Sequence, residues 1–262
     1  MRIADRASTE DEQRRFTAAA RDEFTNSLAM VNTALSTWPV LRRDDSAGAK
    51  ADHVAVAVYL GHSEARATAL NAALRSGSAP AWDSYLPCLI SGLRRLPVHR
   101  RGVLCHGEAP DRDDPRWRVG AVLTDRAFRT ASADLEIVVP GADADILIWS
   151  RTGRQVSILD PTLDEVVFAP GARFRTLAVD TATDEPAEGA VAAPDPRPPK
   201  VAILLRELLP AEQPAGAALD DADQLALRRL SGALARRRSG QLRQVDDPDA
   251  AARTTAAGLE LA

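Results

Sequence analysis

The sequence predicts an α+β protein in which helices come first and strands follow. Apolar residues recur at three- and four-residue spacing up to Leu96, which is typical of helices packed on a core. After Pro97 the pattern changes to short apolar runs separated by Gly, Pro and Asp turns, which indicates strands. Alternating strand–helix–strand units do not occur in the pattern, so a parallel α/β sheet is not expected.

Composition narrows the class of protein further. The chain has 262 residues, 45% of them hydrophobic and 27% charged, which is ordinary for a globular protein. Its formal net charge is −4 and basic residues are interspersed with acidic ones, so no nucleic-acid partner is expected. No segment approaches the ~20 apolar residues that span a bilayer, and residues 1–5 lack a signal-peptide core. We therefore expect a cytoplasmic protein with no membrane partner, or one exported by a route that reads no cleavable signal.

The elements follow in order along the chain. One long helix is expected over residues 8–38, ended by Pro39, and then a polar loop over 42–52. The apolar run at 53–59 fits either a helix or a strand. Two further helices and eight strands are then expected, at residues 63–75 and 81–96 for the helices and at 101–104, 119–123, 135–139, 146–149, 156–159, 165–168, 174–179 and 201–205 for the strands.

Composition also divides the chain into three regions. Residues 1–52 form an N-terminal helix and loop, and residues 53–210 form the main domain. Within that domain, residues 181–199 are rich in Pro, Ala, Asp and Glu and predict a flexible insertion. Residues 211–262 are expected to hold one helix, at 220–238, followed by a disordered tail.

Arg101 stands at the start of an expected strand and is followed by Gly102. A guanidinium in this position can bind phosphate oxygens through two parallel hydrogen bonds. Gly102 has no side chain, so a ligand could approach its backbone and pair with its N–H and C=O groups. A surface arginine before a strand is the alternative interpretation, and the pair alone does not decide between them.

Thr130, Ser132 and Glu165 supply the other polar groups that can carry chemistry. Hydroxyl groups at the start of a strand can hydrogen-bond a ribose and a neighbouring carboxylate. Glu165 stands at the entrance of an apolar strand, where burial could direct its carboxylate toward a cleft. Such a carboxylate can bind a ribose 2′-hydroxyl and stabilise an oxocarbenium-like centre. A strand-edge hydroxyl pair and a solvated hairpin acid are the structural alternatives.

In this order and spacing the motifs resemble the Arg, Ser-Thr-Ser and Glu-x-Glu signatures of the arginine-type ADP-ribosyltransferases. The resemblance covers about residues 54–208 and is most detailed over residues 165–175, which are similar to the family's Glu-Val-Leu-Phe-Pro-Pro-Gly stretch. Four further segments resemble parts of the family. Residues 70–75 are similar to the helix before the arginine strand, and residues 93–97 to the Leu-Pro pair before that arginine. Residues 148–156 are similar to the hairpin before the catalytic loop, and residues 204–208 to the closing strand.

The resemblance implies a core of two packed, mainly antiparallel sheets around an NAD cleft, with an N-terminal helical lobe. It assigns Arg101 to the NAD phosphates and the nicotinamide-side ribose, and Gly102 to the nicotinamide carboxamide. Thr130 and Ser132 would order the cleft, with Thr130 nearest the ribose and Glu165. Glu165 would stabilise the transition state as nicotinamide leaves. NAD would be the substrate, and no metal is implied.

Three positions depart from the family pattern. Ala131 replaces the middle hydroxyl, and Arg100 replaces an aromatic residue. Leu163 stands two residues before Glu165, where the family has a Glu or Gln that positions or activates the acceptor. Leucine can do neither, which argues against arginine-specific transfer by the usual route. Asp164 should not substitute, because consecutive strand side chains point to opposite faces.

Two functions therefore remain open. The first is an NAD-dependent mono-ADP-ribosyltransferase, or an NAD glycohydrolase where water is the acceptor, with an unidentified protein or small-molecule acceptor. The second is a catalytically degenerate module of the same fold that binds NAD or a protein. Retention of Arg101, Thr130 and Glu165 favours the enzyme, because cleavage of the nicotinamide–ribose bond requires these groups.

Other chemistries are disfavoured. The four histidines, His53, His62, His99 and His106, do not stand at metal-ligand spacing. His99 and His106 flank a strand and are expected at the surface. Cys88 and Cys105 are expected to be buried free thiols. The arginine run at 236–238 is expected to be a solvated helix C-terminus, where positive charge suits the helix dipole.

Overall fold

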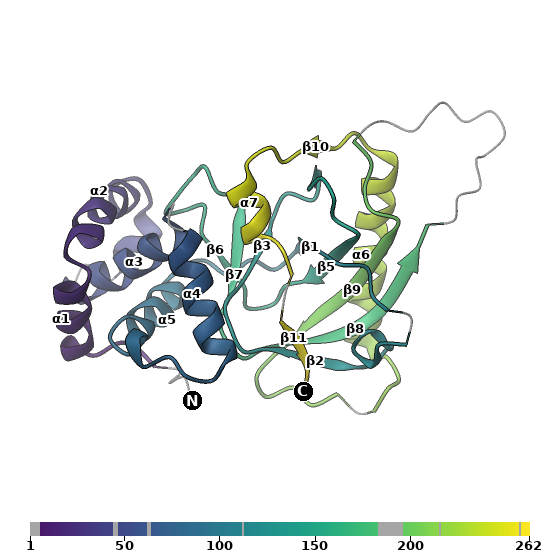
Figure 1. The fold of residues 1–262 in the computed structure, drawn as a ribbon, viewed down its shortest axis with the longest axis horizontal. Helices are drawn as coiled ribbons and strands as arrows, with labels where there is room; N and C mark the ends of the chain where they lie inside the picture. The colour runs from purple at the N-terminus through teal and green to yellow at the C-terminus, as the bar shows by residue number, and fades with distance from the viewer. Residues whose placement is uncertain are drawn as a thin grey trace.

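The structure, a computed structural model, describes residues 6–43, 47–61, 64–111, 113–182, 196–214, 216–256 and 258–262. Its element order confirms the α+β class, with helices before strands. The helical lobe lies beside one end of the β-sheet region (Figure 1). No helix in these ranges combines the length and apolarity needed to cross a membrane. Most of the flexible insertion expected at 181–199 lies outside the described residues.

The helical lobe corrects the expectation of one long N-terminal helix. Its five α-helices are α1 (Glu10–Ala19), α2 (Arg21–Thr37), α3 (Ala47–Leu60), α4 (Glu64–Arg75) and α5 (Leu86–Arg95). The chain breaks at Ala20, whose φ of −101° and ψ of 24° lie outside the helical region. The break brings the rings of Phe16 and Phe24 within 5.9 Å of each other, so core packing overrides the continuous periodicity.

The loop expected at 42–52 is also wrong, because α3 begins at Ala47. Its polar residue Asp52 is fully buried and accepts hydrogen bonds from Ser91 (2.6 Å) and Arg95 (3.2 Å) of α5. Gly92 allows this close approach, since a Cβ there would lie 2.1 Å from the Asp52 carbonyl oxygen. A helix buried on most of its surface shows little polar–apolar contrast, which hid it from the sequence pattern. The expected domain boundary at residue 52 therefore falls within α3.

The helix expected at 81–96 begins later than predicted. Residues Pro80–Trp82 form a 3-10 turn, and α5 starts at Leu86 with Pro87 in its first turn. Proline suits that position because the N–H it lacks would have no helical partner there.

Nine strands form one sheet in the order β11-β2-β8-β9-β5-β1-β3-β7-β6, and β10 pairs with β4 separately. Most pairs are antiparallel, whereas β5–β9 and β4–β10 are parallel. The strands are β1 (Gly102–Gly107), β2 (Val122–Asp125), β3 (Arg129–Ser132), β4 (Ile137–Val138), β5 (Ala144–Trp149), β6 (Arg154–Gln155), β7 (Glu165–Phe168), β8 (Ala172–Thr181), β9 (Val201–Leu208), β10 (Arg243–Gln244) and β11 (Leu259–Leu261).

Seven of the eight expected strands are present, and β7 has the predicted bounds while the ends of the other six differ. The strand expected at 156–159 is a turn instead. Val156 and Leu159 are both buried in the core of the helical lobe, and a three-residue spacing cannot place two side chains on the same face of a strand.

The sheet folds over on itself, which produces the two packed layers implied by the family resemblance. Phe168 on β7 and Phe174 on β8 meet edge to face at 5.4 Å, although four strands separate β7 from β8 in the sheet order. Both rings are buried in one core with Val103 and Cys105 of β1. Leu104, between them in sequence, belongs to a different core, as the two-residue period of a strand requires.

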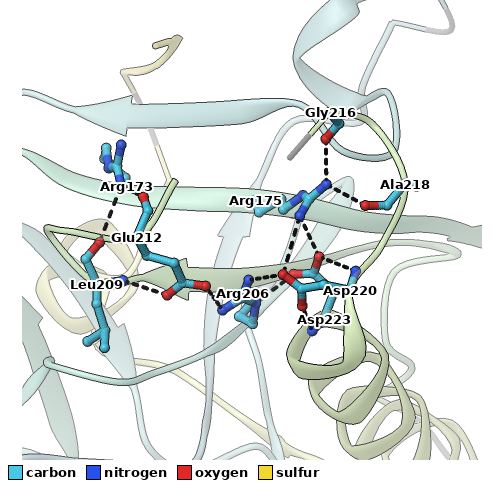
Figure 2. Close-up of polar contacts among 9 residues, drawn as sticks. All are labelled: Arg173, Arg175, Arg206, Leu209, Glu212, Gly216, Ala218, Asp220 and Asp223. Atoms are coloured by element: carbon cyan, nitrogen blue, oxygen red, sulfur yellow. Dashed lines mark hydrogen bonds and ion pairs between the residues drawn. The ribbon is translucent and has the colours of Figure 1, made fainter. Parts of the chain in front are cut away.

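Helix α6 (Asp221–Ser239), expected at 220–238, covers the face of the sheet that carries Leu104. Buried ion pairs fix it there, as Figure 2 shows for its first turn. Asp223 accepts from Arg175 of β8 and from Arg206 of β9, each at 2.6 Å. Near the other end, Arg237 binds Asp145 of β5 through two hydrogen bonds. Arg237 is buried, which corrects the expectation that the whole run at 236–238 is solvated.

The tail beyond α6, expected to be disordered, contains β10, α7 (Pro248–Arg253) and β11. We call residues 243–256 the strap. It runs from the end of α6 through α7 and leads to β11 beside the C-terminus (Figure 1). These elements are too short to be stable alone, so their contacts with the rest of the fold must hold them.

Candidate functional site

Strand pairing brings two of the predicted site residues together. Ser132 of β3 lies directly opposite Glu165 of β7, and it also pairs with Leu104 of β1. Directly opposed residues point to the same face of a sheet, so the side chains of Ser132 and Glu165 share one face. Arg101 immediately precedes β1, which places it at the same end of the sheet.

Glu165 is buried, with 5% of its surface exposed. Burial raises the pKa of its carboxyl group above the ordinary value, and the nearby Arg253 partly opposes that shift. Arg253 Nε donates to Glu165 Oε1 at 2.9 Å. Within the described residues, Glu165 Oε2 is buried without a hydrogen-bond partner, so it can accept one from a ligand hydroxyl group.

The two hydroxyl residues have different neighbours. The Ser132 hydroxyl donates to the Asp134 carbonyl at 3.0 Å and accepts from the Asp134 N–H at 3.1 Å, so it orders the loop after β3. Thr130 lies opposite Val167 and lines a cavity of about 240 Å³ with Asn71. The expectation that Thr130 is nearer than Ser132 to Glu165 is therefore wrong, because the strand register gives that position to Ser132.

Helix α4 carries the motif at 70–75 and contacts the start of β3. Asn71 Oδ1 accepts from the Phe128 N–H at 3.1 Å, and Asn71 Nδ2 donates to the Tyr59 hydroxyl at 3.4 Å. Arg75 lies 3.9 Å from Asp125 Oδ1. The helix therefore fixes the β3 segment on which Thr130 and Ser132 stand.

Arg101 is exposed and lines a cavity of about 930 Å³, a size typical of ligand pockets. Five arginines line this cavity against one carboxylate, that of Asp164: Arg100, Arg101, Arg228, Arg229 and Arg236. Three of them come from α6, and the guanidinium of Arg229 lies 4.7 Å from the ring centroid of Trp149. A concentration of guanidinium groups in an otherwise acidic chain favours an anionic ligand.

Gly102 is covered on the face that α6 occupies. A Cβ built on Gly102 would lie 3.4 Å from Leu230 Cδ2 and 3.6 Å from Leu135 Cδ1. A ligand that pairs with the Gly102 backbone must therefore pass beside Leu230 rather than over it.

Two cavities share Asp164. Asp164 lines both the arginine-rich cavity and a second cavity, of about 590 Å³, which also contains Ser132 and Glu165. Leu163 is half-buried and packs against the core of the helical lobe. It therefore has a packing role and supplies no polar group to an acceptor.

The structure also corrects the expected position of His106. Its side chain is 1% exposed, and Nδ1 lies 3.4 Å from Asp145 Oδ1. Cys88 and Cys105 are buried free thiols, as predicted.

Arg253 and the arginines of α6 were not among the residues predicted for the site. Arg253 stands in the tail that was expected to be disordered, although Asp247 and Pro248 are typical of a helix start. Arg229 sits in a helix that was predicted, but only the fold reveals which strand that helix faces.

The fold is shared with solved ADP-ribosyltransferases. No family model matches the chain. The type III effector XopAI of Xanthomonas axonopodis pv. citri superposes with a TM-score of 0.58 and 19% identity, over 78% of this chain and 85% of that one. The ADP-ribosyltransferase HopU1 of Pseudomonas syringae pv. tomato DC3000 superposes with a TM-score of 0.55 and 14% identity, over 78% of this chain and 100% of that one.

One curated relative is similar in sequence. It is a protein of Mycobacterium avium strain 104 named as an NAD(+)–arginine ADP-ribosyltransferase, Mav, and it is 32% identical over 111 residues. The match covers 40% of this chain and 14% of the relative, so the chain spans only a small part of that protein's length. The resemblance of the motifs to the ADP-ribosyltransferases is thus confirmed.

Proposed function

We propose that this chain binds NAD and cleaves its nicotinamide–ribose bond, passing ADP-ribose to a protein, a small molecule or water. The observation that carries the proposal is the buried Glu165 carboxylate beside Ser132, in a cavity that shares Asp164 with the arginine-rich cavity. The similarity to the M. avium NAD(+)–arginine ADP-ribosyltransferase supports the same chemistry.

The reaction requires one bond to break and one to form. The bond between ribose C1′ and the nicotinamide nitrogen breaks, and nicotinamide leaves with the electron pair. The ionised Glu165 carboxylate stabilises the positive charge left on the ribose. Its free oxygen can also accept a hydrogen bond from the ribose 2′-hydroxyl group. The acceptor then attacks C1′ and loses its proton to solvent. Arg101, with Arg229 and Arg236, would hold the pyrophosphate.

The experiment that tests this proposal is incubation of the protein with NAD, followed by measurement of nicotinamide release and of ADP-ribose binding. It is run on wild type and on R253A, because Arg253 contacts the Glu165 carboxylate. Release of nicotinamide by either protein supports the enzyme. Absence of both release and binding in both proteins contradicts the proposal.

The second candidate is a module that binds NAD or a protein without turnover. Leu163 favours it, because this side chain packs on the helical lobe where the family resemblance implies an acceptor-directed Glu or Gln. Saturable ADP-ribose binding without nicotinamide release in either protein would select this candidate.

Arg101→Ala is expected to weaken ADP-ribose binding about 10- to 100-fold, because a charge-assisted hydrogen bond contributes about 1.5–3 kcal/mol. Arg229→Ala should weaken it as well, since both arginines line the same cavity. The matched control is Arg15→Ala, which removes an exposed arginine of α1 paired with Asp11. Titration calorimetry with ADP-ribose measures the effect, and equal affinity of R101A and R15A would remove Arg101 from the site.

The pH dependence of nicotinamide release reports the ionisation of Glu165. Only the ionised carboxylate can stabilise the ribose cation, and burial raises its pKa above the ordinary 4.5. Activity should therefore fall as pH drops through that raised pKa, at a higher pH than for an exposed glutamate. Arg253→Ala removes a cation that lowers this pKa, so the acidic limb of kcat/KM should move to still higher pH. An unchanged limb would show that another group controls the profile.

A further inference from the structure

The strap forms one wall of the cavity that contains the candidate catalytic carboxylate. The cavity of about 590 Å³ is lined on one side by site residues that include Ser132, Asp164 and Glu165. Its other side is formed by strap residues, from Arg243 to Thr254. A ribose bound at Glu165 would have to enter the space that the strap and the site residues share.

Two arginines of the strap meet two carboxylates of the groove. Arg253 Nε donates to Glu165 Oε1, and Arg243 Nη2 donates to Asp134 Oδ2, both at 2.9 Å. The Arg253 side chain is 17% exposed and that of Glu165 is 6% exposed, so this pair is largely shielded from water. The Arg243 side chain is 69% exposed, so its pair contributes less.

The backbone of the strap pairs like an added peptide strand at both ends. The Arg243 N–H donates to the Glu136 carbonyl at 2.8 Å, and the Val245 N–H donates to the Val138 carbonyl at 2.9 Å. At the other end, the His106 N–H donates to the Thr254 carbonyl at 3.0 Å. Strand β3 pairs with β1 at one position, where Ser132 lies opposite Leu104. Further along the same edge of β1, the strap takes the place of β3, with Thr255 opposite His106. Addition of a backbone to an exposed strand edge is a common way to bind a peptide.

We infer that the groove at Glu165 is a binding site for an arginine-bearing peptide segment, and that the chain covers this groove with its own strap. Arg253 presents a guanidinium to the carboxylate that would otherwise face the NAD ribose, so strap and NAD exclude each other. The competition with NAD rests on the proposed function. The binding of the peptide does not depend on it.

The strap is held less firmly than the helix before it. Helix α6 is fixed through buried ion pairs of Asp223 and Arg237. In contrast, α7 has six residues and contains no buried residue. Segments with few buried contacts open locally at a small fraction of the global unfolding free energy. The strap can therefore leave the groove while α6 and the sheet remain folded.

The first test compares NAD affinity in the full chain. Arg253→Ala and Arg253→Glu should each raise the affinity about tenfold or more, because apparent affinity falls with the fraction of molecules whose site is open. The control is Arg238→Ala, since Arg238 makes an ion pair of 2.6 Å with Asp180 outside the strap. NAD affinity equal in wild type, R253A and R253E would overturn the competition. So would protection of the Ala256 amide from hydrogen exchange that persists at saturating NAD.

The second test needs no NAD. A synthetic peptide of residues 243–256 should bind the R253E protein, whose own strap is repelled by Glu165, in fluorescence anisotropy. The same peptide with Arg253→Ala should bind at least about tenfold more weakly. If the arginine peptide binds while no variant binds NAD, the proposed function fails and the peptide site stands. If neither peptide binds, the inference is overturned whatever the result with NAD.

Discussion

Glu165→Gln is expected to lower the rate of nicotinamide release about 10²- to 10³-fold, while ADP-ribose still binds. Glutamine has nearly the same shape as glutamate but no charge, so it cannot stabilise the cation that forms on the ribose. The loss should appear in kcat rather than in substrate affinity, because the interaction develops mainly in the transition state. Steady-state assays of released nicotinamide measure it.

The matched control for this variant is Asp164→Asn, which neutralises the adjacent carboxylate. Asp164 lines both the arginine-rich cavity and the cavity of Glu165, so D164N removes one charge from the same region and leaves the Glu165 carboxylate in place. We expect D164N to release nicotinamide at close to the wild-type rate. A wild-type rate in E165Q would place the chemistry outside this site, and equal losses in both variants would indicate a general electrostatic effect.

Asp223→Ala is expected to destabilise the fold by about 3–5 kcal/mol, because it leaves Arg175 and Arg206 buried without their shared carboxylate. Both arginine side chains are at most 1% exposed, and both ion pairs to Asp223 are 2.6 Å long. The other contacts of Arg175 are to the carbonyl groups of Gly216 and Ala218 and, at 3.8 Å, to the half-exposed carboxylate of Asp220, which is too distant and too solvated to replace Asp223 (Figure 2). Urea denaturation followed by circular dichroism measures the change in unfolding free energy.

The control for D223A is Asp180→Ala, which breaks the partly exposed pair with Arg238. That variant should lose no more than about 1 kcal/mol, as surface ion pairs usually do. If D223A is as stable as D180A, the two buried arginines must be satisfied by other groups and Asp223 does not anchor α6.

The class and the central strands of this fold could be predicted from the sequence. The change in periodicity at Pro97 separated helices from strands, and β7 was predicted with the bounds that the structure gives. In these segments the apolar residues recur with the period of a helix or a strand, because one face of the element is buried. By contrast, α3 has nearly uniform burial, and the break at Ala20 depends on aromatic contacts that bring Phe16 against Tyr85 of the distant segment before α5.

The candidate site was predictable only where local sequence pattern carries the information. Glu165 and Ser132 could be named as candidates because the local sequence places them at strand ends, and the pairing of β3 with β7 brings them together. Arg253 could not be found, since 88 positions separate it from Glu165 and the strap has little apolar periodicity. The order of Thr130 and Ser132 relative to Glu165 depends on strand register, which the motif alone does not specify.

The strap is tethered at both ends, by α6 before it and by the pairing of β11 with β2 after it. Closure over Glu165 is therefore unimolecular, and dilution of the protein leaves it unchanged. An arginine peptide from another molecule must compete with an effective concentration on the order of millimolar. A protease that cut the chain between β10 and α7 would leave Arg253 tethered through β11 alone, so closure would stay unimolecular but lose the pairing of β10 with β4.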